Sequence, residues 1–244
     1  MAALTGTTGR RRIYLMRHGF VDYTSPEVVK HEDPSRAALT TRGREEAKAA
    51  GLALADIHFD LALCSGLRRT RQTAEIVLAE HPYDLTLEDN PDFEELRSGK
   101  YIHFESQEQL AAVMTFQFEQ AGEPGATFLE GGETFASAMQ RIQAGLKALL
   151  HRPDWACALL VAHEGVNRLI LSHILKASLG TSAGFEQDTG CVNILDFDLV
   201  PSEKQGEAPK IERAMLKALN ITPYNYLKNG MNLRSLEAIF VEPT

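Results

Sequence analysis

Short apolar runs that end abruptly in polar residues recur at three places along the chain. They are residues 13–16 before Arg17 and His18, residues 61–64 before Ser65, and residues 158–162 before His163. A short apolar run with polar residues at its end is typical of a strand that is covered on both faces. The pattern therefore predicts three buried strands, each delivering polar side chains at its carboxyl end.

Helical periodicity follows each of these strands and also occupies the middle of the chain. The predicted helices are 42–55, 68–79, 106–120, 134–151 and 166–175. Thr40 or Thr41 is a candidate N-cap for the first of them.

Three further segments complete the prediction. Residues 191–199 alternate as a strand does, whereas 211–219 fits a helix or a strand. The connection 20–38 contains Pro26 and Pro34, which we expect to oppose regular structure there.

Strands that alternate with helices predict an α/β protein with a mainly parallel central sheet, covered by helices on both faces as a three-layer α/β/α fold. Ligands of such sheets bind outside the carboxyl ends of the strands. We therefore expect Arg17, His18, Ser65, Arg69 and His163 to converge.

Composition narrows the class of protein and of ligand. The 244 residues contain 25 Lys+Arg and 33 Asp+Glu, a formal net charge of −8, which argues against a broad nucleic-acid or membrane-surface footprint. No stretch approaches the roughly 20 apolar residues of a membrane span, and the N-terminal residues do not resemble a signal peptide. The three cysteines are too few for a disulfide framework, so we expect a cytoplasmic protein.

Two histidines and at least two arginines gathered on an acidic protein predict a local anion site. Guanidinium groups match the oxygens of carboxylate and phosphate. A single histidine at a strand end is more often structural than functional, so this prediction depends on the whole set.

Eight motifs follow one another in order along the chain. They are Leu15-Met16-Arg17-His18-Gly19, Leu39-Thr40-Thr41-Arg42-Gly43, Ser65-Gly66-Leu67-Arg68-Arg69-Thr70, Phe93-Glu94-Glu95-Leu96-Arg97-Ser98-Gly99, Gly131-Gly132-Glu133-Thr134, Ala162-His163-Glu164-Gly165, and the closing segments 188–195 and 219–222. Together they resemble the histidine phosphatase superfamily, branch 1, also called phosphoglycerate mutase-like. The resemblance implies a phosphoglycerate mutase-like fold, as a single domain with a small cap insertion.

The resemblance also implies roles for individual residues. His18 would attack phosphorus and carry a phosphohistidine, while Arg17, Arg69 and His163 would bind the phosphoryl oxygens. Neither a cofactor nor a metal ion is expected. Nearby positive charge disfavours the imidazolium, so the arginines would also help to keep His18 neutral.

Glu95 is the expected proton donor to the leaving group and the later base for water. Without the motif, Glu95 would be read as one solvated charge in an acidic loop. Glu164 competes for the role, since another branch of the superfamily has an acidic residue directly after its second histidine. That branch also carries an arginine where this chain has Val21, so we prefer Glu95.

The chain departs from the family pattern after its first histidine. Phe20 replaces Glu or Gln, and Thr24 stands where the family has a phosphate-binding Asn, so we expect Thr24 to bind phosphate with a single donor. Glu164 is also expected near the substrate. Phe20 and some cap aromatics would line an apolar leaving-group site; those aromatics are Tyr101, His103, Phe104, Phe116, Phe118 and Phe128.

A phosphatase is favoured over a mutase. Only 163 − 95 = 68 residues separate Glu95 from His163, and the insertion of the cofactor-dependent mutases is missing. The expected activity is hydrolysis of a small-molecule phosphomonoester through a phosphohistidine on His18, without a metal ion. A phosphoglycerate-type phosphomutase, a catalytically weak phospho-ligand-binding relative and a metal hydrolase remain as alternatives.

The predicted domain organisation has four parts. They are a flexible lead-in over 1–12, a histidine phosphatase domain over 13–222, a cap insertion within it over about 97–130, and a C-terminal extension over 223–244. The expected partner is a small-molecule phosphomonoester, with neither nucleic acid nor membrane, and assembly as a homodimer is left open.

Overall fold

The computed structural model describes residues 9–99, 113, 116–202 and 209–228, and its centre is a six-stranded sheet in the order β3-β2-β4-β1-β5-β6. The strands are β1 (Gly9–Arg17), β2 (Leu61–Cys64), β3 (Leu87–Asp89), β4 (Cys157–Ala162), β5 (Val192–Val200) and β6 (Lys210–Ile221). The pairs β1–β4, β2–β4 and β2–β3 are parallel, whereas β5 runs antiparallel to β1 and β6. The prediction of a mainly parallel sheet is confirmed.

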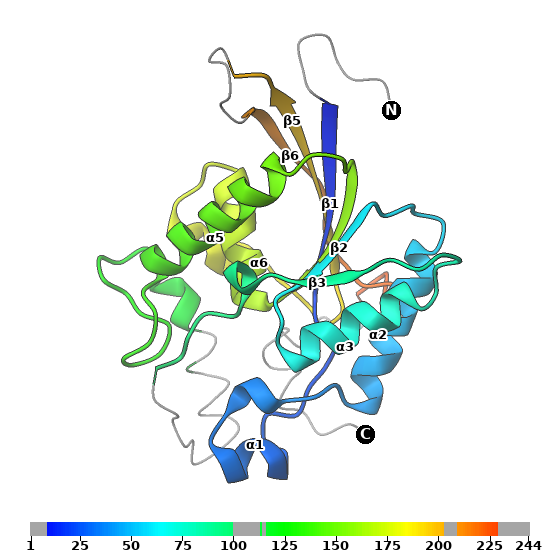
Figure 1. Ribbon diagram of the computed structural model, residues 1–244. Coiled ribbons are helices and arrows are strands. Elements are labelled where there is room, and N and C mark those ends of the chain that lie inside the picture. Colours follow the sequence, from blue (N-terminus) through cyan, green and yellow to red (C-terminus); the bar gives the residue numbers. More distant parts are fainter. Residues whose placement is uncertain (1–8, 100–112, 114–115, 203–208, 229–244) are drawn as a thin grey trace.

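Helices cover both faces of this sheet, which gives the expected three layers (Figure 1). The helices of the layers are α2 (Thr41–Leu54) and α3 (Arg68–Leu78) on one face, and α5 (Phe135–His151) and α6 (Glu164–Ile174) on the other. Four of the predicted helices therefore lie within two residues of their expected bounds.

The alternation of side chains along β1 explains why that strand is apolar throughout its second half. Successive strand residues point to opposite faces of a sheet. Ile13 and Leu15 join the core beneath α5 and α6, whereas Tyr14 and Met16 join the core beneath α2 and α3. Both faces of the strand are thus buried, as in other parallel sheets.

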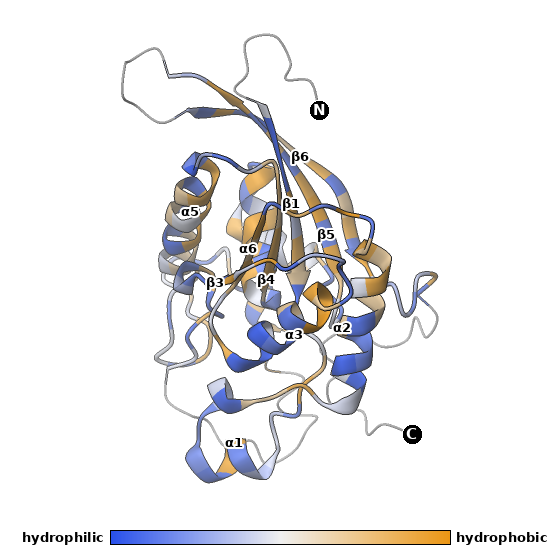
Figure 2. Ribbon diagram, turned by 45° about the vertical axis from the view of Figure 1, so that its right-hand side comes forward, coloured by the Kyte–Doolittle hydropathy of each residue, from blue (hydrophilic) through white to orange (hydrophobic). Residues whose placement is uncertain are grey.

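β1 begins at Gly9, so residues 9–12 belong to the sheet and not to a flexible lead-in. Arg10 and Arg12 pair with Asp198 and Asp196 of β5, with nitrogen–oxygen distances of 2.8 and 2.7 Å. These charged residues form the hydrophilic start of β1, which projects beyond the helical layers (Figure 2). The domain therefore starts earlier than the apolar pattern indicated, because cross-strand ion pairs replace apolar burial there.

The connection 20–38 contains two short helical segments, so the expectation that its prolines oppose regular structure was wrong. They are α1 (Pro26–His31) and a 3-10 helix (Pro34–Arg36). Each begins at its proline, where the missing N–H would have had no helical partner. Two further elements, β3 and a 3-10 helix at Pro91–Phe93, were not predicted.

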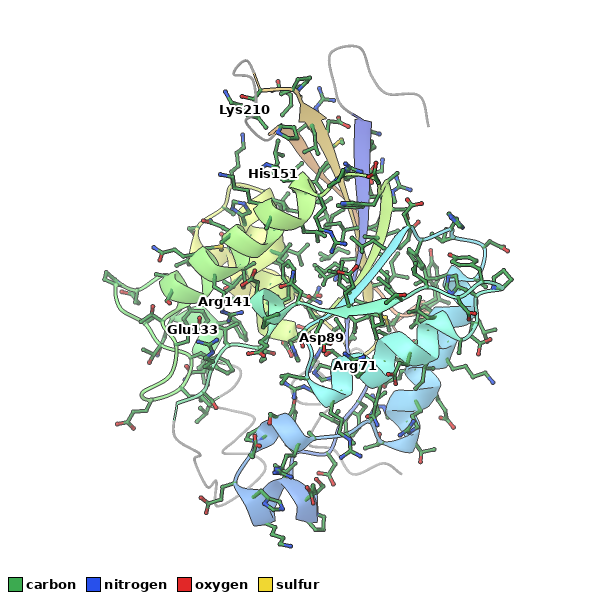
Figure 3. The ribbon with its side chains drawn as sticks, viewed as in Figure 1. Arg71, Asp89, Glu133, Arg141, His151 and Lys210 are labelled. Atoms are coloured by element: carbon green, nitrogen blue, oxygen red, sulfur yellow. The ribbon has the colours of Figure 1, made fainter. Side chains whose placement is uncertain are left out.

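The last strand resolves the ambiguity of residues 211–219, which lie in β6. The C-terminal end of α5 is tied to the start of β6, since His151 Nε2 lies 2.8 Å from the carbonyl oxygen of Pro209, next to Lys210 (Figure 3). A further 3-10 helix spans Leu179–Gly184. Within the described residues, every helix is too short or too polar to cross a membrane.

Candidate active site

The carboxyl ends of β1, β2 and β4 bring His18, Ser65 and His163 to one place, as expected from the pattern of strands. The amide of His18 donates to the carbonyl oxygen of Ala162 at 3.1 Å, and the amide of Ser65 donates to that of Val161 at 3.2 Å. The ring centroids of His18 and His163 lie 5.3 Å apart. Two buried imidazoles therefore face one small region at this edge of the sheet.

The hydrogen bonds of His18 define which of its nitrogens is reactive. Nδ1 lies 2.8 Å from the carbonyl oxygen of Gly19, which can only accept, so Nδ1 carries the proton. Nε2 accepts from Nε of Arg69 at 3.2 Å. Burial, with the charges of Arg69 and Arg17, holds the pKa of His18 well below its usual value. His18 is therefore a neutral imidazole with the Nε2 lone pair turned toward the arginine.

Arg17 is buried and held by two groups at the end of its side chain. Its Nη1 donates to the carbonyl oxygen of Gln187 and lies 2.9 Å from Oε2 of Glu164. Oε1 of Glu164 accepts from Arg168 at 2.7 Å, so this carboxylate balances two guanidinium groups. Nε of Arg17 is buried and has no hydrogen-bond partner among the described residues. The Glu164 carboxylate therefore orients Arg17 within the site.

His163 is oriented by a chain of hydroxyl groups. Its Nε2 lies 2.8 Å from Oγ of Ser65, which in turn lies 2.9 Å from Oγ1 of Thr70. Thr70 donates to the carbonyl oxygen of Leu67 at 2.8 Å. Nδ1 of His163 is buried and lacks a partner within the described part of the chain. Burial, with the charges of the nearby arginines, lowers the pKa of His163 well below its usual value.

The Glu95 carboxyl lies against the N-terminus of α6, the helix that begins directly after His163. Its carboxyl oxygens accept from the amide of Leu96 at 3.0 Å and from the amide of Gly165 at 3.4 Å. A Cβ added to Gly165 would lie 2.7 Å from Oε1 of Glu95, so this approach requires glycine. Burial raises the pKa of the Glu95 carboxyl above its usual value. The group therefore holds its proton to higher pH than a solvated glutamate would.

Two of the expected substrate-binding residues already have partners within the protein. Oγ1 of Thr24 donates to Asp22 at 2.7 Å in an exposed turn. Phe20 is buried, with the guanidinium carbon of Arg42 4.6 Å from the centre of its ring. Motif alignment alone could not supply these contacts.

The structure describes three of the cap aromatics that the sequence predicted for a leaving-group site. Phe118 and Phe128 pack with Phe135 in the core, at centroid distances of 5.7 and 6.3 Å, and Phe116 is 56% exposed. The other aromatics of this segment lie outside the described residues; they are Tyr101, His103 and Phe104.

Sequence reasoning missed several residues that shape the site. Tyr23 lies beside Arg69, with 5.8 Å between the guanidinium carbon and the ring centre. Arg168 and Gln187 hold the Arg17 network, and Arg141 holds the loop of Glu95. The spacing of Glu164 and Arg168, one helical turn apart, was a signal that could have indicated their ion pair. In the described residues, no three His, Cys, Asp or Glu side chains gather as metal ligands would.

The geometry agrees with what comparison with known proteins finds. The model of the histidine phosphatase superfamily (branch 1) matches residues 13–200. The adenosylcobalamin/alpha-ribazole phosphatase of Escherichia coli (strain K12) is 25% identical over 187 residues, which are 77% of this chain and 90% of the relative. The probable phosphoglycerate mutase GpmB of Erwinia tasmaniensis is 26% identical over 169 residues, 67% of this chain and 74% of the relative.

Solved structures share the fold as well. The crystal structure of the alpha-ribazole phosphatase from Shigella flexneri has a TM-score of 0.63 at 25% identity, covering 86% of this chain and 96% of that protein. The solved structure of mycobacterial hydrolase 2 has a TM-score of 0.68 at 20% identity, covering 96% of this chain and 99% of that protein.

Proposed function

The chain belongs to branch 1 of the histidine phosphatase superfamily, and from this premise we propose that it hydrolyses a small-molecule phosphomonoester through a phosphohistidine on His18, without a metal ion. The observation that carries the proposal is the state of His18. Its Nδ1 proton is committed to the Gly19 carbonyl, so Nε2 carries the lone pair, which would attack phosphorus once a bound phosphoryl oxygen takes over the hydrogen bond from Arg69. Relatives described as phosphatases support the hydrolytic assignment.

The first step forms the Nε2–phosphorus bond of His18 and breaks the phosphorus–oxygen bond to the leaving group. Phosphoryl transfer depends mainly on positioning and on charge stabilisation. Arg17 and Arg69 would bind the non-bridging oxygens, and Nε of Arg17 is a donor without a partner among the described residues. His163, whose ring centre lies 5.3 Å from that of His18, would complete the phosphoryl site.

Glu95 would supply the proton that the departing alkoxide requires. Its raised pKa, caused by burial, favours the protonated form that can donate. In the second step the Glu95 carboxylate would accept a proton from water, as the water oxygen bonds to phosphorus and the bond to His18 breaks. The products are inorganic phosphate, free His18 and protonated Glu95.

A phosphomutase is the second candidate, and the resemblance to a probable phosphoglycerate mutase favours its consideration. A mutase returns the phosphoryl group to an alcohol, whereas a phosphatase gives it to water. The two activities separate in one assay with 3-phosphoglycerate, in which released phosphate and isomerised product are measured together. Isomerisation that exceeds phosphate release would replace the hydrolase proposal by the mutase.

The proposal is tested with p-nitrophenyl phosphate, wild-type enzyme and His18→Ala, each with and without a chelator. We expect wild-type turnover that resists the chelator and is abolished by the substitution. An acid-labile phosphoryl group should also be trapped on His18 when the reaction is quenched. Chelator-sensitive turnover would indicate a metal hydrolase, and absence of turnover would indicate a phospho-ligand-binding protein.

A further inference from the structure

Arg141 of α5 reaches across to the loop that carries Glu95 (Figure 3). Its Nη1 donates to the carbonyl oxygen of Asp92 at 2.8 Å and to that of Glu94 at 3.0 Å. Glu94 immediately precedes Glu95 along the chain, and Asp92 lies three residues before it. One guanidinium nitrogen therefore fixes the backbone on the N-terminal side of the proposed acid.

Glu133 holds Arg141 in this position and also contacts the loop on the C-terminal side of Glu95. Its two carboxyl oxygens accept from Nε and Nη2 of Arg141 at 3.1 and 2.7 Å. The amide of Glu133 donates to the carbonyl oxygen of Arg97 at 2.8 Å. Only 8% of the Glu133 side chain and 13% of the Arg141 side chain are exposed, so solvent screens this pair little.

The packing of α5 against the loop supports the same contact. Gly145 lies one helical turn after Arg141, and a Cβ added there would lie 2.5 Å from Cβ of Asp92. The helix thus approaches the loop closely on the face that carries Arg141.

We propose that Glu133 and Arg141 form a positioning clamp that holds Glu95 in the geometry required for proton transfer to the leaving group. This inference rests on the proposed function, since it assumes that Glu95 is the acid. In the described residues, the hydrogen bonds of the Glu95 carboxyl are made to the backbone amides of Leu96 and Gly165. Its position therefore follows the position of its own loop, which the clamp fixes.

Glu95 assists both steps, but only the first step depends on the leaving group, and kcat/KM reports that first step, in which the phosphoryl group passes to His18. A phosphate ester with an acidic alcohol, such as p-nitrophenyl phosphate, needs little protonation of its leaving group, whereas an alkyl phosphate needs a full proton. Displacing Glu95 should therefore slow alkyl phosphates and spare aryl ones. General loss of folding would slow both equally.

The experiment compares kcat/KM for p-nitrophenyl phosphate and ethyl phosphate in Arg141→Met, Arg141→Lys, Glu133→Gln and Glu95→Gln. The matched control is Arg152→Met, which removes an arginine–glutamate pair of similar geometry with Glu88 just after the C-terminal end of α5. We expect Arg141→Met to lower kcat/KM for ethyl phosphate roughly 10- to 100-fold, as small misplacement of a catalytic group does, with less than about a threefold change for p-nitrophenyl phosphate. Arg141→Lys should recover part of the loss, and Arg152→Met should change neither rate.

The outcomes separate the clamp from the proposed function. A selective loss in Glu95→Gln without one in Arg141→Met and Glu133→Gln refutes the clamp and leaves Glu95 as the acid. Equal losses with both substrates in the clamp variants also refute it. If Glu95→Gln shows no selectivity, the acid assignment fails and the clamp fails with it. If Arg141→Met does not fold, Arg141→Lys and Glu133→Gln decide the question with the same two substrates.

Discussion

Nε of Arg69 donates a hydrogen bond to Nε2 of His18 across 3.2 Å. This contact places a permanent positive charge beside the one nitrogen that must stay unprotonated to attack phosphorus. Arg69 also donates to the carbonyl oxygen of Pro34 at 3.4 Å, which anchors the guanidinium from the opposite side. The arginine therefore prepares His18 before substrate arrives and is already placed to bind a phosphoryl oxygen.

Replacing Arg69 by Met should raise the pKa of His18 toward its usual value, because one of the charges that opposes protonation is removed. We expect kcat/KM to fall roughly 100-fold or more, as when one transition-state donor is lost, and to fall further at pH 5.5 than at pH 8. A pH–rate profile measures both effects. The control is Arg68→Met, at the exposed neighbouring position. If kcat/KM of Arg69→Met declined with acid at the same pH as that of the wild type, the role of Arg69 would be contradicted.

Ser65→Ala should release His163 from its fixed tautomer. Since Thr70 donates to Leu67, the Ser65 hydroxyl donates to Thr70 and accepts from Nε2–H of His163. Leaving a buried donor without a partner costs about 1 to 3 kcal/mol, so we expect kcat to fall roughly tenfold. Nitrogen-15 NMR of the His163 ring reports the tautomer directly. Unchanged ring shifts in the variant would show that another group orients His163.

Replacing Glu95 and replacing Glu164 should change different kinetic parameters. Glu95 must be protonated to donate, so kcat for an alkyl phosphate should decline as pH rises through its raised pKa. Glu95→Gln should remove that decline and lower kcat roughly 100-fold. Glu164→Gln should keep the decline but raise KM, because Arg17 loses its carboxylate partner. Loss of the basic decline in Glu164→Gln instead would transfer the role of acid to Glu164.

The elements that the sequence predicted well are those whose signal is local. An apolar run such as residues 13–16 indicates a buried strand wherever it occurs, and the histidine after it must lie at the carboxyl end of that strand. The convergence of His18 and His163 could therefore be predicted before the structure. The structure of residues 9–12 could not, because the aspartates that pair with Arg10 and Arg12 lie more than 180 residues away in the sequence.

The environment of Glu95 is a feature of the site that local sequence could not predict either. Asp92, Glu94 and Glu95 form one acidic stretch, and nothing in their local sequence distinguishes a solvated carboxyl from a buried one. The distinction arises from α6, whose Gly165 leaves room for the Glu95 carboxyl, and from Arg141 on α5. The motif identified the residue, but its raised pKa and its support depend on tertiary packing.

Protein stability should fall with acidification below the usual pKa of histidine. The unfolded chain protonates His18 and His163 near pH 6.5, whereas the folded protein keeps them neutral because their pKa values are depressed. The unfolded state then binds more protons, so the free energy of unfolding decreases as pH drops from about 6.5, by up to about 1.4 kcal/mol per pH unit for each group. Urea unfolding at pH 5.0 to 7.5 measures this slope. His163→Gln should flatten it, whereas exposed His58→Gln should not, and equal slopes in all three proteins would refute the prediction.

Gly43→Ala should destabilise the fold even though it places alanine inside α2. Alanine favours a helix over glycine by about 1 kcal/mol, but a Cβ at Gly43 would lie 2.1 Å from the carbonyl oxygen of Phe20, a backbone atom that cannot rotate away. The clash should outweigh propensity and lower the free energy of unfolding by roughly 1 to 3 kcal/mol in urea titrations. It should also reduce kcat, since the displaced backbone includes Gly19, whose carbonyl holds Nδ1–H of His18. Gly184→Ala is the control, because a Cβ there meets no atom within 4 Å. Equal stability of the two variants would show that α2 can shift away from the backbone of Phe20.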